Sequence, residues 1–151
     1  MNPSDETQGT IITSTRVFAA PREVLFDLFA DAEQLEHWWG PEGFTNTFEQ
    51  FDFEPGGAWR FTMHGPDGTD YPNAKDFVEI VRPERIVFDH VQDGHGFRMT
   101  MTYEAVGEGE TRLTWHVVFA RPLTDDIRAF ILNANEQNFD RLAGQVEKVM
   151  P

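Results

Sequence analysis

The chain contains no cysteine among its 151 residues. This absence excludes disulfides, thiolate metal sites and a cysteine nucleophile, and it agrees with a reducing compartment. Serine is almost as scarce, since only Ser4 and Ser14 occur. Ser4 falls in a polar N-terminal stretch and Ser14 in a predicted strand. A hydrolase built on a serine nucleophile is therefore disfavoured.

Positive charge is also scarce. The chain has 12 Lys and Arg against 26 Asp and Glu, which gives a formal net charge of -14. Such a chain repels the phosphates of nucleic acids and anionic lipid headgroups, and no run of cations offsets this repulsion. No stretch of about 18 apolar residues occurs, and the N-terminus lacks the apolar segment of a secretory signal. We expect a soluble cytoplasmic protein without a nucleic-acid or membrane partner.

The first part of the chain predicts a tail, a strand and two short helices. Residues 1–10 are polar and predicted to be disordered, and a single domain is expected over 11–151. Residues 11–18 have the β-branched composition of a strand. Pro21 suits the first position of a helix. Asp31, with a glutamine three residues later, predicts a capping box that opens a second helix ending at about residue 37.

From about residue 45 the apolar residues recur with a period of two, which predicts a run of strands. In the two clearest ones, every second residue is apolar, from Phe97 to Tyr103 and from Leu113 to Phe119. Short Gly- and Pro-rich turns separate the strands and favour antiparallel neighbours. The predicted strands span residues 46–53, 57–64, 72–82, 85–91, 96–106 and 111–119.

The last part of the chain returns to a helical period. Thr124 is a suitable N-cap, and Asp125 and Asp126 follow where the helix dipole favours anions. We expect a helix to about Val149 with an inward stripe of Leu132, Asn135, Phe139, Leu142, Val146 and Val149. The order of elements predicts an α+β fold, in which a twisted antiparallel sheet of six to seven strands curls around the long helix. The space between sheet and helix is expected to form a cavity that opens near the short helices.

Several motifs, in this order and spacing, resemble the START-like (SRPBCC) helix-grip superfamily, and within it the family named for the activator of the heat-shock-protein-90 ATPase. Together they extend over nearly all of the chain after the tail. The motifs are RVFAAPREV at 16–24, Leu35, WWGPEGF at 38–44, DFEPGG at 52–57, MHGPDG at 63–68, EIVRPERI at 79–86, GETRL at 109–113 and EQNFDRL at 136–142.

The resemblance implies a domain that binds hydrophobic small molecules in a central cavity without a cofactor; some members of the superfamily are polyketide cyclases or aromatases. This chain departs from the family pattern at one point. The family often carries a Gly-Trp pair before the final Asp-Arg-Leu, where this chain has Ala134 and Asn135. An amide in place of an indole is expected to enlarge or rehydrate the cavity.

Aromatic side chains are the main candidates for the cavity wall, because they supply large apolar area both to a core and to a ligand. Asn135 is the favoured polar contact, since an amide on the helix stripe can hold a water molecule or orient a polar atom of a ligand. The predicted ligand-binding residues are Trp38, Trp39, Phe44, Trp59, Phe61, Met101, Trp115, Asn135 and Phe139.

Titratable residues are weaker candidates, for catalysis or for metal binding. His37, beside two tryptophans, and Glu79, on a strand, are the candidates for acid–base chemistry. Arg60 is expected to be a solvated sheet residue or an ion-pair partner. His64 with Asp67 and Asp70 is the least implausible metal cluster, but turn geometry explains it, and no metal is expected.

Three functions remain open. The favoured one is binding of a small apolar or amphipathic molecule by a cofactor-free START-like domain. The alternatives are a module that interacts with a chaperone, and a cyclase or hydrolase that uses His37 or Glu79. The sequence is compatible with a monomer or a homodimer.

Overall fold

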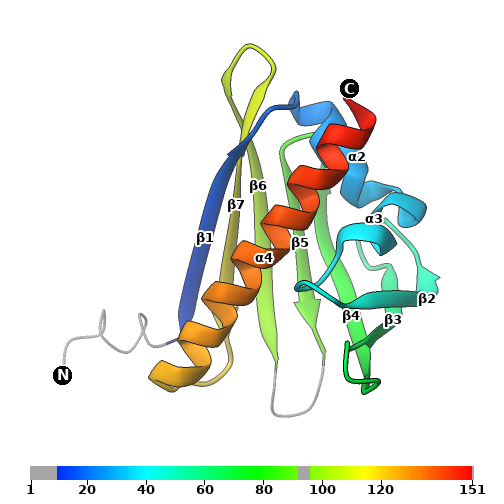
Figure 1. Ribbon diagram of the computed structural model, residues 1–151, viewed down its shortest axis with the longest axis vertical. Helices are drawn as coiled ribbons and strands as arrows, with labels where there is room; N and C mark the ends of the chain where they lie inside the picture. The colour runs from blue at the N-terminus through cyan, green and yellow to red at the C-terminus, as the bar shows by residue number, and fades with distance from the viewer. Residues whose placement is uncertain (1–9, 92–95, 151) are drawn as a thin grey trace.

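The computed structural model describes residues 10–91 and 96–150 and shows seven strands and three helices (Figure 1). The predicted tail therefore lies, apart from Thr10, outside the described residues, as does most of the turn before residue 96. The strands are β1 Ile11–Phe18, β2 Thr45–Phe51, β3 Ala58–His64, β4 Asp70–Val81, β5 Arg85–His90, β6 Phe97–Gly107 and β7 Glu110–Phe119. The helices are α2 Arg22–Ala30, α3 Ala32–Trp38 and α4 Asp125–Val149.

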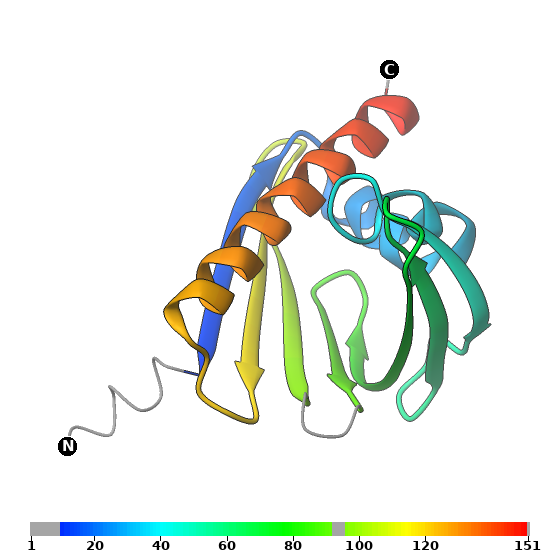
Figure 2. The same ribbon diagram turned by 60° about the horizontal axis from the view of Figure 1, so that its bottom comes forward.

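The strands form one antiparallel sheet in the order β1-β7-β6-β5-β4-β3-β2. Only the first pairing, β1 with β7, joins strands far apart in the sequence, so the short turns do determine the rest of the order. The sheet curves strongly, and α4 lies across its concave side (Figure 2). The predicted α+β helix-grip architecture is confirmed, with strand ends displaced from the predicted ones by no more than two residues.

The helix starts follow local capping chemistry with two small differences from prediction. Pro21 is the N-cap of α2 and not its first residue. The Asp31 side chain accepts a hydrogen bond from the Glu33 N–H at 3.0 Å, but Gln34 accepts instead from Gln145 of α4, so the capping box is not completed. At α4 the Thr124 hydroxyl accepts from the backbone N–H three residues later, as predicted.

The predicted stripe of α4 is correct only in its middle. Phe139, Leu142 and Val146 are buried, whereas Leu132 and Val149 are exposed by 36% and 39%. All buried residues of α4 lie at or after residue 138. The first half of α4 therefore contributes no buried side chain to the core.

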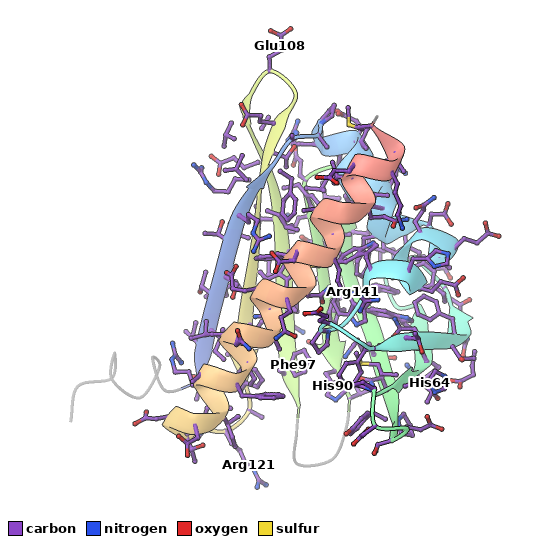
Figure 3. All side chains as sticks on the ribbon, viewed as in Figure 1. His64, His90, Phe97, Glu108, Arg121 and Arg141 are labelled. Carbon is purple, nitrogen blue, oxygen red and sulfur yellow. The ribbon has the colours of Figure 1, made fainter. Side chains whose placement is uncertain are left out.

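Backbone groups of the Trp-Trp-Gly-Pro loop are bound by polar side chains of α4. Asn138 accepts from the Gly40 N–H at 3.1 Å and donates to the Trp38 carbonyl at 2.6 Å. Arg141 donates to carbonyls from His37 to Pro41, and its position beside the loop is visible in Figure 3. This loop therefore joins α4 to the end of α3.

Candidate ligand-binding site

An apolar pocket of about 460 Å³ lies between the start of α4 and the end of the sheet formed by β5, β6 and β7. Its volume falls within the usual range for small-molecule sites, about 300 to 1,000 Å³. The pocket is found at the N-terminal end of α4, while α2 and α3 flank the later part of that helix (Figure 1). The expected opening near the short helices is therefore not where this pocket lies. The lining residues are His90, Gly96, Phe97, Phe119, Arg121, Pro122, Leu123, Thr124, Ile127 and Ile131.

The pocket exists because the first half of α4 stands away from the sheet. Ile127 and Phe130 are exposed by 50% and 71%, respectively. This half of the helix is attached mainly to the edge strand β1. Arg128 donates to the Ile11 carbonyl at 2.7 Å, and Asn135 donates to the Ser14 hydroxyl at 3.1 Å. The helix thus covers the ends of β6 and β7 without filling the space above them.

One cross-strand row leads from the pocket into the interior. Phe119 of β7 pairs with Phe97 of β6, Phe97 with His90 of β5, and His90 with Lys75 of β4. The His90 and Phe97 rings stack with centroids 4.8 Å apart, and Figure 3 shows both residues at the same end of the sheet. These two rings form a wall of the pocket, and Lys75 lies directly behind them.

Lys75 is a buried amine in aromatic surroundings. Its side chain is only 3% exposed, and its Nζ lies 2.9 Å from His90 Nδ1 and 3.3 Å from Asn73 Oδ1. Nζ also lies between 5.0 and 5.9 Å from the ring centroids of four aromatic residues. The rings are those of Phe97, Phe88, Phe61 and Trp59. Among the described residues no carboxylate forms an ion pair with this amine.

Burial determines the ionisation of this amine. Ring faces attract an ammonium group, but removal of the charge from water opposes it. The second effect is larger and lowers the pKa of Lys75 from 10.5 to about 7. The charge of this amine can therefore change near neutral pH.

The lining of the pocket differs in charge from the rest of the molecule. The chain carries 26 acidic residues, yet none of the lining residues that the structure describes is Asp or Glu, and they include Arg121 and His90. Arg121 lies at the rim with its side chain pointing outward in Figure 3. The pocket thus combines apolar walls with groups that can bear positive charge.

Most of the predicted aromatic wall is packed as hydrophobic core. Phe29 lies among these rings and contacts Trp38, Trp39 and Trp59 at centroid distances of 5.5 to 6.4 Å. Phe44 is half-buried outside this cluster and contacts Tyr71 at 6.0 Å. The predicted residues that are at most 7% exposed are Trp38, Trp39, Trp59, Phe61, Met101, Trp115 and Phe139. None of the predicted ligand-binding residues lines the pocket described above.

Two tryptophans of that cluster carry buried donors without partners. Among the described residues, neither Trp59 Nε1 nor Trp115 Nε1 has a hydrogen-bond partner. Buried N–H groups usually find an acceptor, and an unpaired one marks a place where water or a ligand atom would be stabilised. Trp59 pairs with Lys75 in the sheet, so one of these donors belongs to the row that leads to the pocket.

Asn135 is half-buried and faces β1, where Ser14 accepts its hydrogen bond. It lies on α4 beyond the residues that line the pocket. Its proposed role as a ligand contact stays a prediction.

The acid–base candidates lie outside the pocket. His37 is exposed in the last turn of α3, and its backbone carbonyl accepts a hydrogen bond from Arg141 of α4. A bulge after Phe77 breaks the alternation of β4, so Glu79 reaches the outer face and pairs with Arg85. Arg60 forms an ion pair with Asp76 at 3.0 Å, as predicted.

The metal candidate is explained by side-chain bonding within its hairpin. His64 Nδ1 lies 2.7 Å from Asp70 Oδ1 and its Nε2 lies 2.7 Å from Thr47 Oγ1, while Asp67 accepts from the Thr69 N–H. Within residues 10–91 and 96–150, no three His, Asp or Glu side chains are grouped as metal ligands. In the same part of the chain, no helix has the length and apolarity needed to cross a membrane.

Lys75 is the functional candidate that sequence reasoning missed. A signal was present, because strand alternation places Lys75 on the same face as Phe77, between outward-facing neighbours. What the alternation could not show is that β5 contributes His90 directly opposite. The pairing of strands determined that contact.

Comparison with known proteins agrees with this architecture. Residues 19–147 match the family model described as Activator of Hsp90 ATPase homolog 1-like protein. The chain belongs to this family. No curated protein matches the sequence.

Solved structures of other proteins share the fold across nearly the whole chain. A protein from Arthrobacter aurescens has a TM-score of 0.84 at 23% identity, covering 94% of this chain and 88% of its own. A protein from Chromobacterium violaceum has a TM-score of 0.79 at 25% identity, with coverages of 91% and 97%. An AHSA1 protein from Silicibacter pomeroyi has a TM-score of 0.74 at 24% identity, with the same coverages.

Membership of the family clarifies what its shared motifs do here. The Trp-Trp-Gly-Pro and Asn-Phe-Asp-Arg segments supply core and loop contacts, as the bonds of Asn138 and Arg141 show. The START-like fold is one that binds ligands in general. The pocket, with the Lys75–His90 pair behind its wall, is the candidate ligand site of this chain.

Proposed function

We propose that the protein binds a small apolar or amphipathic molecule in the pocket between the first half of α4 and the ends of β5, β6 and β7. The observation that carries the proposal is the pocket itself, with a volume of about 460 Å³ and mainly apolar walls. A ligand that covers the apolar walls removes them from water, which is favourable. The START-like fold supports the same assignment.

Filling the pocket tests the proposal. Ile131 lines it, and the variant Ile131→Trp should occupy part of the volume with an indole. Its neighbour Phe130 is 71% exposed and lies outside the lining, so Phe130→Trp is the matched control on the same helix. A library of apolar and amphipathic compounds is then screened by thermal shift on all three proteins.

A ligand present at about 100 times its Kd adds about 2.7 kcal/mol, which corresponds to a rise of about 5 to 10 °C in Tm for a domain of this size. We expect this rise for the wild type and Phe130→Trp, and its loss in Ile131→Trp. Equal shifts in all three proteins would place the ligand elsewhere. Native mass spectrometry of the freshly purified wild type provides a separate check for a co-purifying small molecule.

The alternative functions are supported by fewer observations. A chaperone partner follows only from the family's description, and its test is the ATPase rate of an Hsp90 protein with and without this chain. A cyclase or hydrolase based on His37 or Glu79 has no support from their positions outside the pocket. The cytoplasmic location expected from the lack of cysteine stays a prediction.

A further inference from the structure

Lys75 is one of only two lysines in the chain, and its burial requires a physical explanation. A buried amine without a carboxylate partner opposes folding whenever it is protonated. An apolar residue of the same length would fill the space without this cost. Lys75 contacts His90, and His90 lines the pocket. This location indicates that the charge of Lys75 acts on a molecule bound in the pocket.

Three observations indicate that the missing partner of the Lys75 amine is negatively charged. Within residues 10–91 and 96–150, no acidic side chain lines the pocket, although the molecule as a whole is strongly acidic. Arg121 lies at the rim, and His90 forms part of the wall. Behind His90, the Lys75 amine is without an ion-pair partner among the described residues.

We infer that the ligand is an amphipathic carboxylic acid whose apolar part lies against Phe97, Phe119 and Ile131 and whose carboxylate lies at the His90 wall, with Lys75 as countercharge. The inference rests on the proposed function, since it names the class of molecule bound in the same pocket. One buried ammonium group balances one negative charge, which favours a carboxylate over a dianionic phosphate. In a water-poor site the attraction between the two charges is much stronger than in solvent.

The inference has a consequence for proton uptake. A bound carboxylate favours the protonated amine, so binding should raise the pKa of Lys75 above its value of about 7 and take up a proton at neutral pH. The groups that face the amine are His90 from β5, Asn73 from β4 and aromatic rings from β3, β5 and β6. His90 can also titrate, so its contribution must be separated from that of Lys75.

Decanoate and decanol provide matched probes, because they share an apolar chain and differ in the charged group. Affinities are measured by isothermal calorimetry from pH 6 to pH 8.5, a range in which decanoate stays ionised. The key variant is Lys75→Met, which replaces the charged side chain by an unbranched apolar one that is shorter by one atom and leaves His90 in place. Lys148→Met, at the far end of α4, removes the same charge from an exposed position and is the control.

We expect the wild type and Lys148→Met to bind decanoate about 10-fold to 100-fold more tightly than decanol at pH 6.5, in keeping with a charge-assisted contact. The preference should decline as pH rises above 7 and should be absent in Lys75→Met at every pH. Ile131→Trp should weaken the binding of both probes.

Three results would overturn the inference, and only the last of them also overturns the proposed function. If decanol binds as well as decanoate and Ile131→Trp weakens both, the pocket is a binding site but its preference is not anionic. If Lys75→Met keeps the preference for decanoate, another cation supplies the countercharge. If neither probe is affected by Ile131→Trp, the proposed function fails with the inference.

Discussion

At the scale of single residues, Lys75 contributes a destabilising term that depends on pH. Its pKa is about 7 in the folded protein and 10.5 in the absence of burial. Below pH 7 the amine is protonated in both states, so the full penalty of a buried charge applies. Between pH 7 and 10.5 the unfolded state binds more protons, so the free energy of unfolding rises with pH.

The variant Lys75→Met should remove this penalty. The difference between the two pKa values corresponds to an energy on the order of 5 kcal/mol. We therefore expect Lys75→Met to be more stable than the wild type by about that amount at pH 6, and by less than about 1 kcal/mol at pH 10. Urea unfolding at a series of pH values measures the difference. A gap that stays constant with pH would mean that packing, and not ionisation, separates the two proteins.

Asn138 is the residue on which the loop contact depends most directly. Its side chain accepts from the Gly40 N–H and donates to the Trp38 carbonyl, and it is 5% exposed. Asn138→Ala would leave both backbone groups buried without a partner. Each unpaired group costs about 1 to 3 kcal/mol.

We therefore expect Asn138→Ala to lower the free energy of unfolding by about 2 to 4 kcal/mol. Chemical denaturation measures this change. Asn133→Ala, at an exposed position on the same helix, is the control and should change stability by less than about 0.5 kcal/mol. Equal effects of the two substitutions would show that the loop does not depend on Asn138.

At the scale of elements, α4 has two halves with different roles. From residue 138 onward it contributes Phe139, Leu142 and Val146 to the core and binds the loop after α3. Before that point it has no buried residue and bridges the pocket from the edge strand β1. The half that carries stability is thus separate from the half that carries the candidate site.

One row of paired residues across the sheet likewise has an end at the pocket and an end in the interior. The row from Phe119 to Lys75 places one residue from each of four strands side by side. At the pocket end its members are Phe97 and Phe119, both half-buried, and at the interior end the row continues to Trp59, which is fully buried. The pocket and Lys75 are therefore connected through directly paired neighbours.

At the scale of the whole molecule, net charge opposes compactness. The chain has a formal charge of -14, while its described ion pairs involve side chains that are mostly more than one-third exposed. Exposed pairs contribute little to stability, whereas repulsion acts between many like charges and is screened by salt. We expect the Tm to rise by about 2 to 5 °C between 20 mM and 500 mM sodium chloride. A scanning calorimetry series checks this, and a falling Tm would mean that the ion pairs outweigh the repulsion.

Much of the architecture could be predicted, because it depends on periodicity and turn chemistry that are local in the chain. Alternation in residues 97–103 and 113–119 identified two strands and their buried faces correctly. Thr124 identified the start of α4. Such patterns arise from residues close together in the chain, so they can be recognised without knowledge of the rest of the fold.

The candidate site followed only from the tertiary structure. The sequence determined that the chain is rich in aromatic residues, acidic and built of seven strands and a long helix; it could not say which aromatic rings would fill the core. Trp59 and Phe61 became core because the sheet closes over them, whereas Phe97 and Phe119 border a pocket because α4 begins above them and stands away. Lys75 and His90 meet because strands β4 and β5 pair in one register. Each of these outcomes depends on distances between segments that are separate in the sequence, and local pattern carries no information on such distances.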